Sequence, residues 1–66
     1  MAELVSQLKA VRSEAGLTQQ ELADRVGVSR KTINTVENGV FVPSTTLALK
    51  LARELGRPVE ALFSLD

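Results

Sequence analysis

All four glycines of this 66-residue sequence stand where a short amphipathic segment stops, at Gly16, Gly27, Gly39 and Gly56. Glycine commonly ends helices because it adopts the left-handed backbone conformation easily. No stretch shows the sustained alternation of apolar and polar residues that marks a β-strand. The spacing of the glycines therefore predicts an all-α domain of short helices.

Residues that favour helix starts precede these segments. Thr18 and Glu21 form a capping-box pattern, and Ser29 and Ser44 are good N-caps. Pro58 suits the first turn of a last helix, since its missing amide would be unpaired there. The predicted helices cover about residues 3–14, 19–26, 30–38, 45–55 and 59–63, and the first of them aligns Leu4, Leu8 and Val11 on one face.

The composition excludes several classes of function. The 66 residues suffice for a single domain, 1–66, without cysteine or histidine, so we expect no disulfide, no metal site, no cofactor and no enzyme active site. No apolar run is long enough to cross a bilayer, and the N-terminus has no signal-peptide pattern. We therefore expect a cytoplasmic, nucleoid-associated protein with no membrane partner and no small-molecule ligand.

The formal net charge is zero, which taken alone argues against a nucleic-acid-binding protein. The charges are unevenly distributed, however. Residues 25–36 contain Arg25, Arg30 and Lys31 and no acidic residue. A chain without net charge can thus have a basic face.

The segment Gln19 to Asn38 predicts a helix-turn-helix. Its two helices, about 19–26 and 30–38, are joined by a tight turn that has Gly27 at its first bend. Ile33 and Val36 would face the core from the second helix. The outer side of that helix would then present Arg30, Lys31, Asn34 and Thr35.

This outer side has the chemistry needed to read bases. An α-helix fits the major groove of DNA, and residues near the start of a recognition helix reach the base edges. The side chains of Arg30 and Lys31 can donate hydrogen bonds to the O6 and N7 of guanine, while the methyl group of Thr35 could contact thymine. The alternative is an ordinary solvated helix face that carries two basic residues.

The run "LTQQELADRVGVSRKTINTVENG", followed by "PS", "LALKLARELG" and "ALF", resembles the phage repressor and Cro (Xre-like) helix-turn-helix family. The resemblance covers about residues 4–63 and implies a five-helix, lambda-repressor-like domain that binds operator DNA, usually as a dimer. It assigns base contacts to Arg30, Lys31 and Thr35, with Asn34 as a further candidate. Phosphate contacts are expected from Gln19, Ser29, Thr32, Asn38 and Gly39.

The same resemblance pairs Arg12 with Glu37 as a structural ion pair. Two positions depart from the family pattern. Val40 stands where many relatives have a basic residue that reaches a phosphate, so we expect a shallower dependence of DNA binding on salt. Arg57 stands where relatives commonly have an apolar residue, and it could approach DNA or an acidic partner.

The turn after the predicted recognition helix is unexpectedly apolar. Apolar residues on a surface turn suggest that another surface covers it. We expect a self-complementary homodimer interface, made by Val40, Phe41, Val42, Leu62, Phe63 and Leu65. The alternative for Phe41 is that its ring folds back onto the fourth helix of its own chain.

Three functions are compatible with these features. The first is a sequence-specific transcriptional regulator, expected to be a repressor, that binds a pseudo-palindromic operator as a homodimer. The second is a DNA-binding antitoxin of a toxin-antitoxin pair. The third is a protein-interaction module that has lost DNA binding, which zero net charge and Val40 favour and Arg30 and Lys31 oppose.

Overall fold

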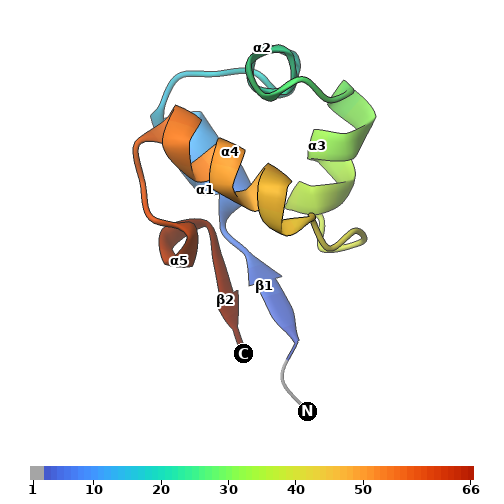
Figure 1. The fold of residues 1–66 in the computed structure, drawn as a ribbon, viewed down its shortest axis with the longest axis vertical. Helices are drawn as coiled ribbons and strands as arrows, with labels where there is room; N and C mark the ends of the chain where they lie inside the picture. Colours follow the sequence, from blue (N-terminus) through green and yellow to red (C-terminus); the bar gives the residue numbers. More distant parts are fainter. Residues whose placement is uncertain (1–2) are drawn as a thin grey trace.

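The computed structural model describes residues 3–66 and contains five helices and a small sheet (Figure 1). The elements follow one another as β1 (Leu4–Ser6), α1 (Leu8–Glu14), α2 (Gln19–Val26), α3 (Arg30–Glu37), α4 (Thr45–Leu55), α5 (Val59–Leu62) and β2 (Phe63–Leu65). The predicted five-helix architecture is confirmed. Figure 1 shows α2 and the two strands at opposite ends of the molecule, with α3 along one side.

The two strands are a feature that the sequence analysis did not predict. β1 and β2 pair antiparallel, with Leu4 opposite Leu65 and Ser6 opposite Phe63. The first helix was predicted to begin near Glu3, and this is wrong because residues 4–6 form β1 and the helix begins at Leu8. Three-residue strands are too short to show an alternating pattern, and their hydrogen bonds come from the far end of the chain.

The predicted helix caps are present. The Thr18 hydroxyl accepts a hydrogen bond from the Glu21 amide at 3.0 Å, and the Thr18 amide donates to the Glu21 carboxylate at 2.9 Å. These bonds to Thr18 lower the pKa of Glu21 below its ordinary value, with the backbone bond as the largest cause. Ser29 and Ser44 accept from the amides of Thr32 and Leu47 in the same way. The starts of α2, α3 and α4 are therefore fixed locally.

One contiguous core joins all five helices and β2. Its buried apolar residues are Leu8, Val11, Leu22, Ala23, Val26, Ile33, Val36, Leu47, Leu51, Leu62 and Phe63. Leu62 and Phe63 are only 0 % and 6 % exposed, so they belong to this core. Both side chains were predicted to lie in a dimer interface, but the core absorbs them and leaves almost no side-chain surface for a partner.

The turn between α2 and α3 depends on Gly27. Its φ is +75°, in the left-handed region, and a Cβ added there would meet nothing within 4 Å. The cost of Gly27→Ala therefore comes from the backbone alone, and we expect the free energy of unfolding to fall by about 1–2 kcal/mol. Chemical denaturation of the purified variant measures this loss. Gly27→Asn should lose less, since asparagine tolerates this conformation, and equal stability of all three proteins would contradict the assignment.

Candidate nucleic-acid interface

Helices α2 and α3 pack against each other through their inner sides. Ile33 and Val36 of α3 are buried, as are Leu22 and Ala23 of α2. Val28, in the turn between the two helices, is partly buried against the core. Because this packing uses one side of α3, its other side faces solvent along the flank of the molecule (Figure 1). The helix-turn-helix geometry expected from the sequence is thus present.

The predicted base-contacting residues share the outer side of α3. Arg30 and Lys31 are exposed, and Asn34 and Thr35 are half-buried one turn further on. The Thr35 hydroxyl donates a hydrogen bond to the carbonyl oxygen of Thr32 at 3.0 Å. This bond holds the side chain against the helix. Among residues 3–66, neither Arg30 nor Lys31 forms a salt bridge, so both charges are available to a ligand.

The structure brings Arg12 and Glu37 together, as the resemblance suggested. Arg12 Nε lies 2.5 Å from Glu37 Oε2, and the two side chains are 12 % and 2 % exposed. A second guanidinium nitrogen of Arg12 donates to the carbonyl oxygen of Leu17 at 2.8 Å. The pair therefore ties α1 and the chain before α2 to the end of α3, and it neutralises the only acid in α3.

Gln19 connects this ion pair to the start of α3. Its Nε2 donates to Glu37 Oε1 at 2.9 Å, and its Oε1 accepts from Arg30 at 3.5 Å, the long limit for such a bond. A chain of contacts thus runs from Arg12 through Glu37 and Gln19 to Arg30. The link between Gln19 and Glu37 was not predicted from the sequence, because residues 18 positions apart on different helices leave no local pattern.

The predicted phosphate-contacting residues fall into two groups. Gln19 stands at the start of α2, and Asn38 and Gly39 are exposed at the end of α3. Asn38 Nδ2 donates to the carbonyl oxygen of Asn34 at 3.0 Å, which holds Asn38 beside the outer side of α3. Ser29 and Thr32 form the second group. Their hydroxyl oxygens are 3.0 Å apart at the start of α3.

Thr32 also borders a depression of about 290 Å³ between the turn after α2 and the start of α4. Thr32 therefore lies toward α4, whereas Lys31 and Asn34 lie on the outer side of α3. The sequence left the role of Arg57 open. A guanidinium nitrogen of Arg57 lies 3.4 Å from a carboxylate oxygen of Glu14, so Arg57 has an acidic neighbour in its own chain. In residues 3–66 no group of acidic side chains could hold a metal ion, and no helix is long and apolar enough to span a membrane.

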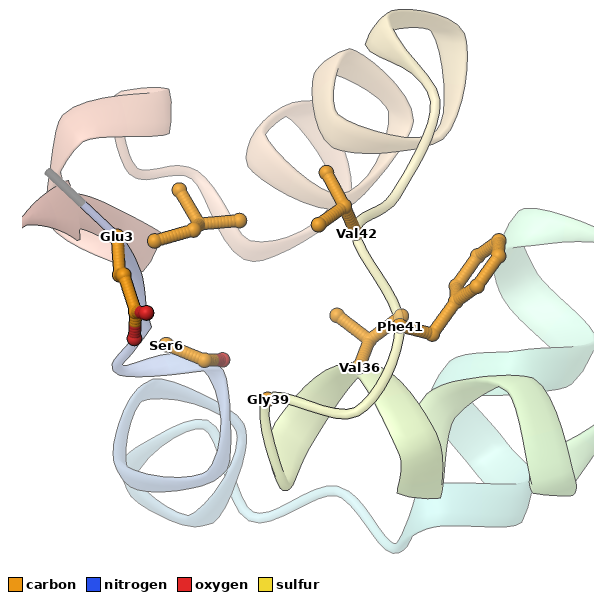
Figure 2. Close-up of a pocket in the computed structure, with 7 residues that line it drawn as sticks. Glu3, Ser6, Val36, Gly39, Phe41 and Val42 are labelled. Carbon is orange, nitrogen blue, oxygen red and sulfur yellow. The ribbon is translucent and has the colours of Figure 1, made fainter. Parts of the chain in front are cut away.

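The apolar turn after α3 does not present one continuous patch. Val40, Phe41 and Val42 are 78 %, 49 % and 69 % exposed. Figure 2 shows the side chains of Phe41 and Val42 pointing away from each other. Both residues border a hollow of about 390 Å³ between β1 and the turn. Phe41 also borders the depression near the start of α4, so the ring packs partly beside its own chain.

Comparison with known proteins assigns the chain to a family. A relative from Methanothermobacter thermautotrophicus, named an uncharacterized HTH-type transcriptional regulator, is 55 % identical over 56 residues, which are 83 % of this chain and 81 % of the relative. Repressor protein C of Rhizobium phage 16-3 is 46 % identical over 56 residues, which are 85 % of this chain but 21 % of the repressor. The crystal structure of a protein from Bacteroides fragilis, titled a putative DNA-binding protein, superposes on this chain with a TM-score of 0.85 at 26 % sequence identity. The superposition covers 92 % of this chain and 98 % of the other.

The sequence profile of the helix-turn-helix family matches residues 8–62, from the first residue of α1 to the last residue of α5. This range contains all five helices and every predicted DNA-contacting residue. The expected absence of an enzyme active site agrees with this family. The protein belongs to the helix-turn-helix family of DNA-binding domains.

Proposed function

We propose that the protein is a transcriptional regulator that binds duplex DNA sequence-specifically, with α3 in the major groove. The observation that carries the proposal is the charge on α3. Its two basic residues, Arg30 and Lys31, are exposed and form no salt bridge among residues 3–66, while Glu37 is buried against Arg12. A recognition helix with free cations and a neutralised acid suits the negative surface of DNA.

Arg30, Lys31, Asn34 and Thr35 would contact base edges, since they share the outer side of α3. Arginine or lysine in this position can bond guanine, and asparagine can bond adenine through two hydrogen bonds. The contacts to phosphates would flank this helix. Gln19, Asn38 and Gly39 are the best placed for them, and the hydroxyls of Ser29 and Thr32 would add to these contacts at the start of α3.

A homodimer on a pseudo-palindromic operator would double this limited contact area. In known helix-turn-helix dimers the half-sites lie about one helical turn, roughly 34 Å, apart. The names of the relatives support a role in transcription: one is called a transcriptional regulator and the other a repressor. Such a protein would act in the cytoplasm at the nucleoid, where it occludes or recruits polymerase.

Selection of bound sites from a pool of random duplexes by gel shift tests this function. We expect an inverted repeat to be recovered, with affinity that falls as salt rises. Because Val40 replaces a basic residue, the slope of log affinity against log salt should be shallower than that of a Val40→Lys variant by about one for each copy bound, or about two for the dimer. No binding above background at low salt would contradict the proposal and leave a protein-interaction module or a toxin partner to be sought.

A further inference from the structure

An apolar surface lies beside the two-stranded sheet, on residues outside the proposed DNA site. Leu4, Val42, Leu49 and Leu65 are 37 %, 69 %, 58 % and 69 % exposed. The first three border a depression of about 270 Å³. Leu65 lies directly opposite Leu4 in the sheet, so both side chains are on the same face. We call these four residues the sheet surface. Contiguous exposed apolar residues of this kind mark interaction sites more often than single ones do.

The backbone beside this surface has unused hydrogen-bonding groups. The Gln7 amide donates to the Leu62 carbonyl and the Asp66 amide donates to the Glu3 carbonyl. The pairs Gln7–Leu62 and Glu3–Asp66 are therefore hydrogen-bonded pairs of the ladder. Because bonded and non-bonded pairs alternate in an antiparallel ladder, Val5 and Ser64, which lie midway between them, are a bonded pair too. The polar backbone groups of Phe63 and Leu65 therefore point to the outer edge of β2. The Phe63 amide there already donates to the Val59 carbonyl of α5.

This outer edge is self-complementary. It offers two acceptors, the carbonyls of Phe63 and Leu65, and one donor, the Leu65 amide, which lies two residues from the Phe63 carbonyl. A two-fold axis beside Ser64 would match the donor of each copy with the acceptor of the other. Edge strands of monomeric proteins usually carry a lysine, a proline or a bulge that prevents such pairing, whereas β2 reads Phe-Ser-Leu. Among residues 3–66 no third strand covers the edge.

We propose that a second copy of this chain binds here, pairing β2 with β2 into a four-stranded sheet and covering the sheet surface. This deepens the homodimer proposed above and rests on that proposal. The assignment differs from the interface expected from the sequence. It keeps the side chains of Val42 and Leu65, adds those of Leu4 and Leu49, and leaves Val40 and Phe41 outside. Phe63 takes part through its backbone carbonyl. None of the proposed base-contacting residues of α3 borders the depression of the sheet surface, so they would stay free for DNA.

A single introduced cysteine tests the strand pairing directly, because the chain has none of its own. In the proposed pairing Ser64 faces Ser64 of the second copy in a non-bonded pair. The Cα atoms of such a pair are about 4.5 Å apart, within the range that a disulfide spans. Ser64→Cys should oxidise rapidly to a covalent dimer. Ser13→Cys, exposed on α1, is the matched control and should remain mostly monomeric.

Equal cross-linking of the two cysteine variants would overturn the proposal. Sedimentation without DNA gives the second readout, which does not depend on the proposed function. The parent should be a dimer, and Leu65→Lys and Leu49→Lys should each raise its dissociation constant by about tenfold or more, because a buried leucine is lost. Val40→Lys should leave the constant unchanged. Thermal melting followed by circular dichroism checks that every variant is folded.

A parent that sediments as a monomer, or lysine variants that dimerise as the parent does, would refute the interface. Binding of Leu65→Lys to duplex DNA tests the proposed function separately. Leu65→Lys keeps Arg30 and Lys31 and should still bind a half-site, with lower affinity for the full inverted repeat. If the parent dimerised through the sheet surface but bound no duplex, the interface would stand and the proposed function would fail.

Discussion

Arg12→Met is expected to lower the free energy of unfolding by about 3–5 kcal/mol, the largest effect on stability that we predict for a single substitution. The Glu37 side chain is only 2 % exposed, and Arg12 is its charged partner. Without Arg12 the carboxylate would keep only the amide of Gln19, at 2.9 Å. The Leu17 carbonyl would also lose the guanidinium that bonds it. A buried charge without a counter-charge is costly, and a domain of this size has little stability to lose.

Thermal unfolding of the purified variant measures this effect. For a domain of this size, about 1 kcal/mol lowers the melting temperature by roughly 4–8 °C, so the variant could be partly unfolded at ordinary temperatures. The matched control is the double variant Arg12→Met with Glu37→Met, which removes both charges. It should be more stable than Arg12→Met alone, since an apolar pair can replace a buried ion pair at little cost. If Arg12→Met alone were as stable as the parent, the Glu37 carboxylate would be solvated well enough without Arg12, and the prediction would be wrong.

The ends of the helices could be predicted because local chemistry fixes them. All four glycines have φ between +65° and +75°, as expected where a helix stops at a left-handed residue. Thr18, Ser29 and Ser44 each cap a helix through their own hydroxyl groups. These signals act within a few residues of the chain, so a single sequence contains them in full. The outer side of α3 followed in turn from the spacing of its buried residues.

Features that depend on distant residues could not be predicted in this way. Leu4 fits the apolar spacing of a first helix, but it lies in β1 because Leu65 pairs with it. Leu62 and Phe63 read as surplus apolar surface, yet they complete the core. The contact of Gln19 with Glu37 has the same origin, since it needs the packing of two helices. The sequence predicted the residues of the candidate DNA site but not the hydrogen bonds that orient them.

Replacing Arg30 and Lys31 together with alanine should reduce binding of the selected site to the level of unrelated DNA. A side chain bonded to guanine through two hydrogen bonds contributes about 1–3 kcal/mol of discrimination, so each loss would weaken specific binding by roughly tenfold to a hundredfold. Both side chains are exposed, and among residues 3–66 neither has a salt-bridge partner. The melting temperature should therefore hardly change. Fluorescence anisotropy with specific and scrambled duplexes measures both affinities.

The scrambled duplex decides what these two side chains do, because base contacts and phosphate contacts respond differently. Loss of a base contact weakens binding to the selected site far more than to the scrambled one, whereas loss of a phosphate contact weakens both equally and lowers the salt slope by about one per side chain. Lys9→Ala combined with Arg53→Ala, which removes two exposed charges from α1 and α4, is the control for net charge. If this control matched the double variant at Arg30 and Lys31, general attraction would account for the binding. Equal weakening on both duplexes by the double variant alone would assign Arg30 and Lys31 to the phosphates and leave Asn34 and Thr35 to read the bases.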